Sequence, residues 1–510
     1  MAWLIGDSFD FYNAIADMSA GHWDLADSTY ISLSTTTRFN IGKSIARNSS
    51  STSNPALTKS FGSNEATVFV ALAFQQTSAL SGTNAGFAIT LRDGATAQCS
   101  IVFRSDGVIL LTGGGPTGST LATYSSAFAQ NVWAHFQFKI VINNSSGSIN
   151  VRKDGAGSDS FSATSLNTRG GTANNYASAV AAFFCNASLN HQIDDLLVYS
   201  TSGAAPNDWS GDVRAVQLMP SAETAQKQFA PSPTTSTEGH TSTSGSTNQS
   251  ANTIYFVGAA ANPQTPILPT VSGVVNTTTA NFNSSMIGNI KMALYAADGA
   301  SSAPGTLLSV SDAVVNPGAG VVNFTHSTPA TVTKGVGYWL AFLSDTLWSS
   351  KYYVSSPRGC WHPAQSYGSG FPNPAVPGAY DGNASHFYAT MTITVTNDSN
   401  VDEAAEDGDT SYVYDSTNGH EDLYDLDNLA ATPTSIIAVQ SRMFAKKSDS
   451  GARNGQIRVK SGATEVGGTD TALSTTYTWL NRVDVVDPNT AAAWTAAAVN
   501  ALQIGPKVTA

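Results

Sequence analysis

The chain has 510 residues, of which only 12% are charged, about half of the roughly 25% that is usual in soluble domains. Hydrophobic residues make up 41% and aromatic residues 9%, which excludes a disordered polymer and requires a buried core. The net charge is −12, and Lys and Arg are not clustered, so we expect no nucleic-acid partner. The length predicts about three domains.

Three cysteines, Cys99, Cys185 and Cys360, are too few for a disulfide framework. We expect small buried side chains, although a Cys99–Cys185 bridge stays open. The segment Met1–Asp7 has no basic region and no long apolar run, so it is not a signal peptide. No stretch approaches the roughly 18 apolar residues of a membrane span, and we expect no membrane insertion.

Short strand-like runs, separated by turn residues, fill the first 200 residues of the chain. Their side chains alternate between apolar and polar, the period of a sheet with one buried side. Many such strands without helical periods between them predict a sandwich or a barrel. The runs are Ala66–Phe74, Phe87–Leu91, Cys99–Phe103, Val108–Leu111, Val132–Ile142, Ile149–Val151, Val180–Phe184 and Ile193–Tyr199.

Two phrases within these 200 residues carry a family resemblance. The first is the long strand Asn131-Val-Trp-Ala-His-Phe-Gln-Phe-Lys-Ile-Val-Ile, then a polar turn and Ser148-Ile-Asn-Val-Arg-Lys-Asp-Gly. The second is the closing strand Ile193-Asp-Asp-Leu-Leu-Val-Tyr. This order resembles the laminin-G or concanavalin-A-like jelly roll. The resemblance implies that residues 1–200 form such a domain.

A Ser/Thr-rich segment, residues 231–252, has the composition of a flexible linker. A second β unit follows, with alternating or apolar strands at Ile290–Tyr295, Gly337–Leu343 and His386–Val395. The phrase that begins at Leu294 and ends near Asp345 resembles jelly-roll accessory modules of carbohydrate-associated and cell-surface proteins. We expect an independent β-sandwich over residues 233–398.

The last unit, residues 399–510, opens with the acidic segment Asp402–Asp409 and continues with strands and one short helix at Trp494–Leu502. Together with Trp209-Ser-Gly-Asp-Val-Arg before the linker, it resembles the C-terminal region of tailed-bacteriophage virion proteins. In such relatives the two parts lie close together in sequence. We therefore expect residues 201–232 to begin a discontinuous C-terminal β-sandwich, into which residues 233–398 are inserted. The whole chain is expected to be all-β, built of several sandwiches.

The run Leu4-Ile-Gly-Asp-Ser8 invites comparison with esterases whose nucleophile would be Ser8. Such a serine needs a base and an orienting acid, and none of the eight histidines follows an aspartate at the required Asp-x-x-His spacing. The Glu-x-Asp-x-x-Glu pattern of concanavalin-like glycanases is also missing. We therefore expect no catalytic residues and no enzymatic activity.

Pairs of acidic residues raise calcium binding as a minor alternative to a chain without a metal site. Asp194 and Asp195 are adjacent on a strand and should point to opposite sheet faces, so they should not act as a pair. Asp407-Gly-Asp409 and Asp425-Leu-Asp427 fail the EF-hand spacing and are expected in solvated loops. Cys and His show no zinc spacing. We expect no cofactor and no metal site.

The stretch Trp348–Tyr380 combines aromatic residues with Pro and Gly and is typical of a long irregular loop. Aromatic side chains on loops stack on sugars or anchor partners, but they also pack a loop onto its own domain. Both readings stay open. The candidate ligand-binding residues are Trp348, Tyr352, Tyr353, Trp361 and Tyr367.

These features predict a non-enzymatic structural protein of a tailed-phage virion: a tail fibre, a minor tail protein or a capsid decoration. Its expected partners are other virion proteins, further copies of itself in a trimer or higher symmetric assembly, and a host-surface glycan. The alternative is a secreted or surface carbohydrate-binding protein of a bacterium. The missing signal peptide favours the phage.

Overall fold

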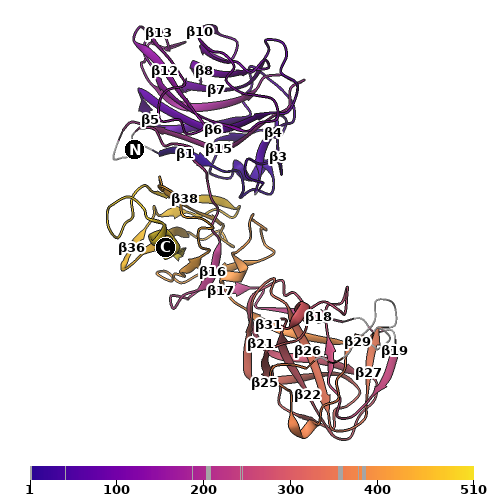
Figure 1. The fold of residues 1–510 in the computed structure, drawn as a ribbon. Helices are drawn as coiled ribbons and strands as arrows, with labels where there is room; N and C mark the ends of the chain where they lie inside the picture. Colours follow the sequence, from indigo (N-terminus) through magenta and orange to yellow (C-terminus); the bar gives the residue numbers. More distant parts are fainter. Residues whose placement is uncertain are drawn as a thin grey trace.

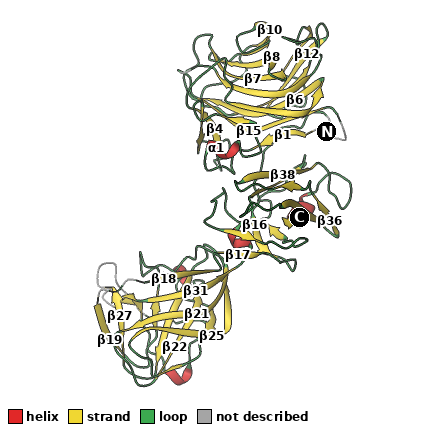
Figure 2. Cartoon of the chain, turned by 180° about the vertical axis from the view of Figure 1, so that it is seen from behind, coloured by secondary structure: helices red, strands yellow, loops and turns green. Residues whose placement is uncertain are grey.

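The computed structural model describes residues 3–40, 42–186, 188–202, 208–241, 243, 245–353, 360–376, 378, 380–381 and 386–510. Strands make up 47% of the structure and helices 4%, which confirms the all-β fold class. The helices are short and lie between strands along the chain (Figure 2). Three units follow one another in space, and the C-terminal unit lies between the first unit and the inserted one (Figure 1).

The first unit is a sandwich of two antiparallel sheets. The first sheet has the order β13 (Phe161–Leu166), β12 (Gly147–Lys153), β11 (Ala134–Val141), β6 (Thr67–Gln76), β15 (His191–Ser200), β4 (Ser44–Arg47) and β3 (Ile31–Ser34), and β1 (Trp3–Asp7) also pairs with β15. The second has the order β10 (Ser119–Tyr124), β9 (Ile109–Gly113), β8 (Thr96–Arg104), β7 (Ala85–Asp93), β14 (Ala177–Phe184), β5 (Leu57–Glu65) and β2 (Leu25–Ala26). Helix α1 (Ile15–Met18) follows β1.

The core of the first unit lies between its two sheets and is rich in phenylalanine. Phe74 of β6 stacks on Phe103 of β8 with ring centroids 4.3 Å apart. Phe136 and Phe138 of β11 meet the Phe103 ring edge to face. These side chains occupy every second position of their strands, so the alternation in sequence is the alternation between core and surface.

The outer face of the first sheet is covered by the rest of the chain. Phe69 of β6 stacks on Tyr199 of β15 with centroids 4.7 Å apart, and Trp209 of the connecting segment meets Phe69 edge to face at 5.5 Å. Ile437 and Val485 of the C-terminal unit pack on the same cluster. The first unit therefore uses this face for docking.

A second contact at this junction is built around Arg442 of the C-terminal unit. Its guanidinium lies 4.4 Å from the ring centroid of Trp479, donates a hydrogen bond to the Tyr12 hydroxyl at 2.7 Å, and lies 3.8 Å from an oxygen of Asp7. The buried Asp7 carboxylate also accepts hydrogen bonds from Tyr12 and Trp23 at 2.8 Å. The indole N–H of Trp479 also donates a hydrogen bond to the backbone carbonyl of Asp17 in the first unit.

The C-terminal unit is built from two separate stretches of chain. Its main sheet has the order β16 (Pro220–Glu223), β33 (Tyr424–Leu426), β39 (Gln503–Val508), β35 (Asn454–Ser461) and β36 (Thr464–Gly467), with β37 (Thr471–Ala472) also on β35. Ribbon β34 (Val439–Ala445)–β38 (Thr478–Asp484) and helix α2 (Ala496–Asn500) cover it, and β17 (Ala230–Ser232) pairs with β32 (Tyr412–Tyr414). The second layer is thus a two-stranded ribbon, smaller than that of a full sandwich.

The inserted unit is a second sandwich. One sheet has the order β18 (Thr235–His240), β31 (Ala389–Val395), β21 (Gly273–Phe282), β27 (Trp348–Tyr353) and β19 (Gly245–Gln249), with β25 (Gly320–Val332) also on β21 and β30 (His386–Phe387) on β27. The other has the order β20 (Tyr255–Val257), β26 (Tyr338–Ser344), β22 (Asn289–Ala296) and β23 (Leu307–Val310), with β24 (Val314–Val315) on β22. The pair β28 (Cys360–Trp361)–β29 (Tyr380–Asp381) and the 3-10 turns η1 (Ala300–Ser302), η2 (Tyr367–Ser369) and η3 (Asp398–Asn400) complete the described elements.

The expectation of a flexible linker at residues 231–252 is wrong. This segment contains β17, β18 and β19, and β18 pairs residue by residue with β31, from Thr235 opposite Thr394 to His240 opposite Ala389. Serine and threonine serve here as strand residues with polar outward side chains, a use that β propensity allows and that composition alone does not reveal.

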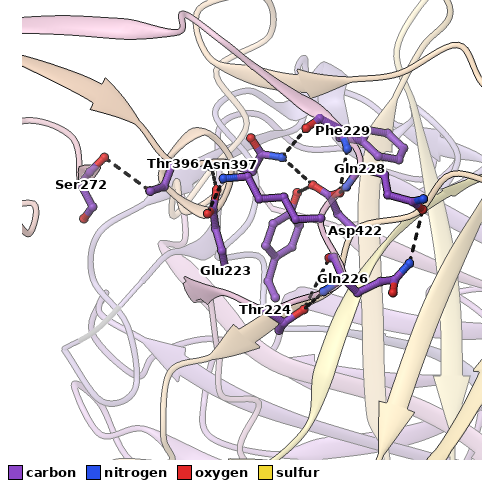
Figure 3. A network of polar contacts seen from close by, with 11 residues as sticks. Glu223, Thr224, Gln226, Gln228, Phe229, Ser272, Thr396, Asn397 and Asp422 are labelled. Carbon is purple, nitrogen blue, oxygen red and sulfur yellow. Dashed lines mark hydrogen bonds and ion pairs between the residues drawn. The ribbon is translucent and has the colours of Figure 1, made fainter. Parts of the chain in front are cut away.

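Two chain segments connect the C-terminal unit with the inserted unit, and a buried polar network holds these two segments together (Figure 3). One Asp422 oxygen accepts hydrogen bonds from the backbone N–H groups of Gln228 and Phe229, at 2.5 and 2.8 Å. The other accepts from the side chains of Asn397 and Tyr424, both at 2.7 Å. Asn397 also donates to the Phe229 carbonyl and to Glu223. The segment that leaves the C-terminal unit and the segment that returns to it therefore both bond to the Asp422 carboxylate, which fixes the connection. We call this connection the elbow.

All three cysteines are free, so the Cys99–Cys185 bridge is not formed. Burial raises the pKa of both thiols to about 12. Among the described residues, helices are too short to cross a membrane.

We predict that Asp422→Ala lowers the free energy of unfolding of the C-terminal unit by about 3 kcal/mol or more, because four donors lose their acceptor, two of them in fully buried hydrogen bonds. Thermal melting of the full chain measures it. Asp422→Asn keeps the shape of the side chain but turns one acceptor into a donor, so its free energy of unfolding should lie between those of the parent and of Asp422→Ala. The matched control is Asp425→Asn on the exposed side of β33, which should melt like the parent. Equal melting of all four proteins would contradict the elbow.

Candidate functional site

The outer face of the second sheet in the first unit is the candidate site, because the docking face described above lies on the other sheet. Side chains that point outward form two rows across the strands. One row is Phe183, Ala88, Val102 and Leu110, taken from β14, β7, β8 and β9. The second row is Ala181, Thr90, Ser100, Thr112 and Thr120, which continues onto β10.

The hydroxyl row is internally bonded at its centre. The oxygens of Thr90 and Ser100 lie 2.8 Å apart, and Ser100 donates to the Gly114 carbonyl at 2.8 Å. Thr112 donates to the Gly115 carbonyl at 2.9 Å. These bonds fix the loop after β9 against the sheet, and they position the exposed Thr117 and Thr120 at its rim.

A depression of about 200 Å³ lies where the two rows meet this loop. Its floor is apolar, made by Ala85, Val102 and Leu110, and its rim carries hydroxyl groups and one guanidinium. The other lining residues are Thr83, Arg104, Thr112, Pro116, Thr117, Gly118 and Thr120, of which Thr83, Thr117 and Thr120 are exposed. An apolar floor with a hydroxyl rim suits a small neutral polyol such as a sugar ring, which has C–H faces and hydroxyl edges.

A second depression, of about 400 Å³, lies on the same sheet beyond β14. It is lined by Ser60, Gly62, Ser63, Asn64, Gly94, Ser178 and Ala179. The two depressions lie at opposite sides of the central strands of this sheet, one near β8 to β10 and the other near β5 and β14. An extended ligand could therefore cross this sheet from one side to the other.

The sequence analysis placed its candidate site on the inserted unit, and Trp348 does not lie at a surface there. Its side chain is 2% exposed and packs among the rings of Tyr255, Phe282, Phe342 and Phe387. The prediction that Trp348 binds a ligand is therefore wrong, because the residue begins strand β27 and points into the core.

The next aromatic residues of that stretch pack a loop onto its own sheet. Trp361 is half-buried and meets Trp339 edge to face at 4.8 Å, and Phe371 packs on Tyr295. Tyr367 belongs to the same cluster, and the Lys291 ammonium lies 5.6 Å from its ring centroid. Of the two readings left open, the structure favours packing for these rings.

Tyr352 and Tyr353 lie on β27, where they pair with the backbones of Phe387 and His386. Their side chains lie outside the described part of the structure, so their role as ligand-binding residues stays a prediction. Residues 354–359, 377 and 379 of the same stretch also lie outside the described residues.

Asp194 and Asp195 do not point to opposite faces, contrary to the sequence-based expectation. A β-bulge interrupts the pairing of β15 with β6 between Asp194 and Leu197, and Asp195 has a φ of 50°. Both carboxyls reach Arg38: its backbone N–H donates to Asp194 at 3.1 Å, and its guanidinium lies 3.7 Å from Asp195. Asp195 also accepts from the backbone of Ala215 at 2.9 Å. The pair therefore fastens the connecting segment to the first unit.

These carboxyls are hard to ionise because they are buried together. Burial, reinforced by the neighbouring Asp195, raises the pKa of Asp194 to about 7. Burial raises the pKa of Asp195 to about 6, against the opposing effects of the Ala215 hydrogen bond and of Arg38. The negative charge of Asp10 raises the pKa of both carboxyls further, and the positive charge of Arg214 lowers the pKa of Asp195.

The other acidic candidates also serve contacts within the chain. Asp407 accepts from Ser411 at 2.6 Å, Asp409 pairs with Lys446 at 2.7 Å, and Glu406 accepts from the backbone of Asn13 in the first unit. Of the residues expected in solvated loops, Asp409, Asp425 and Asp427 are exposed, whereas Asp407 and most of the acidic segment before it are half-buried at the junction. Within the described residues, no three Asp, Glu, His or Cys side chains form a ligand set for a metal.

Ser8, the residue of the esterase-like run, is 5% exposed and lies against Asp10. Its neighbour Asp7 is committed to the junction through Tyr12, Trp23 and Arg442. Burial lowers the pKa of the nearby His22 to about 4, and this imidazole lies 3.4 Å from Asp7. The run therefore forms part of the docking interface.

Comparisons with known proteins give partial structural likenesses. No protein-family model and no curated protein sequence matches the chain. Galectin LEC-6 of Caenorhabditis elegans is similar over 29% of this chain and 91% of its own, at 15% identity and a TM-score of 0.21. The module CBM66 of Bacillus subtilis covers 33% and 92%, at 10% identity and 0.22. A carbohydrate esterase of the Shiga toxin-encoding bacteriophage phi24B covers 33% and 85%, at 15% identity and 0.23. These values are too low to assign a function to the chain.

The outer face of the second sheet was missed in the sequence because its signal is weak. Thr90, Ser100 and Thr112 alternate with core residues on three neighbouring strands, which marks them as outward-facing. Nothing in the sequence says that the three strands are neighbours, or that the opposite sheet is covered.

We predict that the stability of the junction falls as pH rises from about 5 to 8. The raised pKa values mean that the folded chain holds these protons more tightly than the unfolded chain, for which the ordinary Asp value is 3.8. The protonated carboxyls therefore favour folding at low pH, and this stability is lost as pH rises through about 6 to 7.

The substitution Asp194→Asn turns one acceptor toward the N–H of Arg38 or Asp195 into a donor at every pH, so the test is the change with pH. Relative to the parent, the variant should gain about 2 kcal/mol of stability between pH 5 and pH 8, since one unit of pKa corresponds to about 1.4 kcal/mol. Calorimetry at both pH values measures this. The control is Asp449→Asn on an exposed turn, which should change neither value. A stabilisation that is equal at pH 5 and pH 8 would rule out the protonation argument.

Proposed function

We propose that this chain is a non-enzymatic structural component of a tailed-phage particle that presents a glycan-binding face to the host surface. The observation that carries the proposal is the fixed spacing of its units. The first sandwich and the inserted sandwich occupy opposite ends, and the C-terminal unit joins them (Figure 1). Both connections are buried contacts, one through Phe69, Tyr199 and Trp209 and one through Asp422.

Rigid spacing is what an attachment protein needs and what a hydrolase does not require. A structural subunit must hold a binding face at a set distance and orientation from the body that carries it. The low share of charged residues, 12%, also permits close lateral packing of copies in a symmetric assembly. The resemblance of the C-terminal region to virion proteins supplies the link to a phage.

The outer face of the second sheet supports the glycan as ligand. Its depression combines an apolar floor with the hydroxyls of Thr83, Thr117 and Thr120. The same observation supports the second candidate function, a carbohydrate-binding protein of a bacterial surface. The two differ in where the protein resides.

We predict that substitution of Thr120 by Arg, which fills the depression, lowers the affinity for a bound host glycan by at least about tenfold. Polysaccharide prepared from host cells and immobilised on a sensor surface provides the measurement. The control is Thr164→Arg on β13, at the edge of the first sheet. Equal binding by the two variants would place the glycan site elsewhere, and binding by neither parent nor variant would remove the glycan from the proposal.

The residues that bond to Asp422 all lie outside residues 236–393, while Ser272 and Lys334 within that range bond to Ser399 and Asp402. Thr235 and Thr394 face each other in the β18–β31 ladder, so a two-residue turn between them can replace residues 236–393 and close a short hairpin. We predict that the shortened chain melts cooperatively, like the parent's first and C-terminal units. Loss of its cooperative transition would show that the insert is integral to the fold.

Residence on a particle is tested directly. Mass spectrometry of purified particles from a strain that carries the gene should detect this chain at a copy number set by particle symmetry. Detection on cells but not on particles would favour the bacterial surface protein.

A further inference from the structure

The outer face of the other terminal unit, the inserted sandwich, carries a threonine array. Strands β18, β31, β21 and β25 lie side by side in both views (Figures 1 and 2). Across them, Thr237 faces Thr392, Thr392 faces Thr277, and Thr277 faces Thr325. The next row is Gly239, Thr390, Thr279 and Asn323. We call these two rows the threonine face.

The threonine face points away from the core of its own sandwich. On β31 the alternate residues Ala389, Met391 and Ile393 are buried in that core, which places Thr390, Thr392 and Thr394 on the outside. Thr237 and Thr325 are exposed and Thr277 and Thr392 are half-buried. The loop that carries Trp361 packs on the other sheet of this sandwich.

The hydroxyls of the first row have no partner within the described part of the chain. No hydrogen bond joins the side chains of Thr237, Thr277, Thr325 or Thr392 to described residues. Other hydroxyls of the face are satisfied: Thr279 donates to Asn323 at 2.9 Å, and Thr394 accepts from Asn276 at 3.0 Å. The four hydroxyls that make no hydrogen bond to the described residues therefore form one continuous row across four strands, and solvent can reach them.

A notch interrupts the second row at Gly239. Thr390, opposite Gly239, is only 3% exposed, and its hydroxyl also has no described hydrogen-bond partner. Gly239 has a φ of 124°, and a Cβ built on it would meet the Ala389 carbonyl oxygen at 2.5 Å. The backbone conformation thus excludes a side chain that would close the notch, and a nearly buried hydroxyl is left facing it.

The threonine face carries no charge. Its outward positions on the four strands hold Thr, Asn, Gly and Val, and the carboxylate of Asp312, bonded to Ser327, lies at its edge. Neighbouring strands are about 4.8 Å apart and alternate residues of a strand are about 6.6 Å apart, so the hydroxyls form a regular lattice. A charged partner gains nothing here, whereas a flat neutral ligand with repeated hydroxyls can bond to the row and pack on its methyl groups.

We propose that the threonine face is a second carbohydrate-binding surface, specific for extended uncharged polysaccharide. Sugar hydroxyls donate to and accept from the row Thr237–Thr392–Thr277–Thr325, and one sugar substituent enters the notch at Gly239 and Thr390. The surface is separate from the first unit, so it does not depend on the function proposed for that unit. The rival occupant is a second copy of the same face.

The test uses the full chain and the double substitution Thr277→Val and Thr392→Val, which removes two hydroxyls and keeps the shape and strand propensity. The control is Thr164→Val on an exposed strand of the first unit. The probes are dextran, mannan, xylan and insoluble cellulose, with heparin as the charged comparison. We expect the double variant to lose at least about tenfold affinity for one uncharged polysaccharide, with melting unchanged and the control unaffected.

Three results would overturn the proposal. The first is that the full chain binds none of the uncharged probes. The second is that binding is lost with Thr120→Arg of the first unit but survives the double valine variant, which leaves the proposed function intact. The third is that sedimentation shows a dimer that Thr392→Lys dissociates, which would assign the face to self-association. Binding that survives Thr120→Arg and is lost in the double variant supports it.

Discussion

The outer face of the first sheet, with Phe69 and Tyr199 at its centre, determines much of the arrangement of this chain. Two stacked rings and their neighbours Ala71 and Leu197 form an apolar surface that water would have to cover. The connecting segment covers it with Trp209, and the C-terminal unit completes the cover. Because the first sheet is covered in this way, the outer face of the second sheet is the sheet face of the first unit that the C-terminal unit leaves uncovered.

The second connection, between the C-terminal and inserted units, is also a buried contact, but polar groups form it in place of aromatic rings. Asp422 and Asn397 are both fully buried and bonded to each other, and both also bond to backbone groups of the segment that leaves the C-terminal unit. A buried carboxylate is tolerated there because several donors surround it. The inserted sandwich is consequently oriented by hydrogen-bond geometry, and its threonine face has a fixed direction relative to the first unit.

The all-β fold and the positions of most strands could be predicted because alternation is a local property. The strand at Ile193–Tyr199 and the short helix before Gln503 are of this kind. Three features could not be predicted, because each depends on distant partners. Strands form within residues 231–252 because they pair with β31 and β27. Trp348 is buried because aromatic rings distant in sequence pack around it. A bulge in β15 directs Asp194 and Asp195 toward Arg38. Composition and local pattern contain none of these contacts.

The elbow has a mechanical consequence. The chain enters and leaves the inserted unit on the adjacent antiparallel strands β18 and β31, so this unit is attached by two covalent strands that run side by side. A single tether would swivel, whereas two parallel tethers resist torsion and divide a tensile load. A pull on the inserted unit would therefore reach the C-terminal unit through β17 and η3 together, and the hydrogen bonds of Asp422 would be loaded in parallel and not one after another.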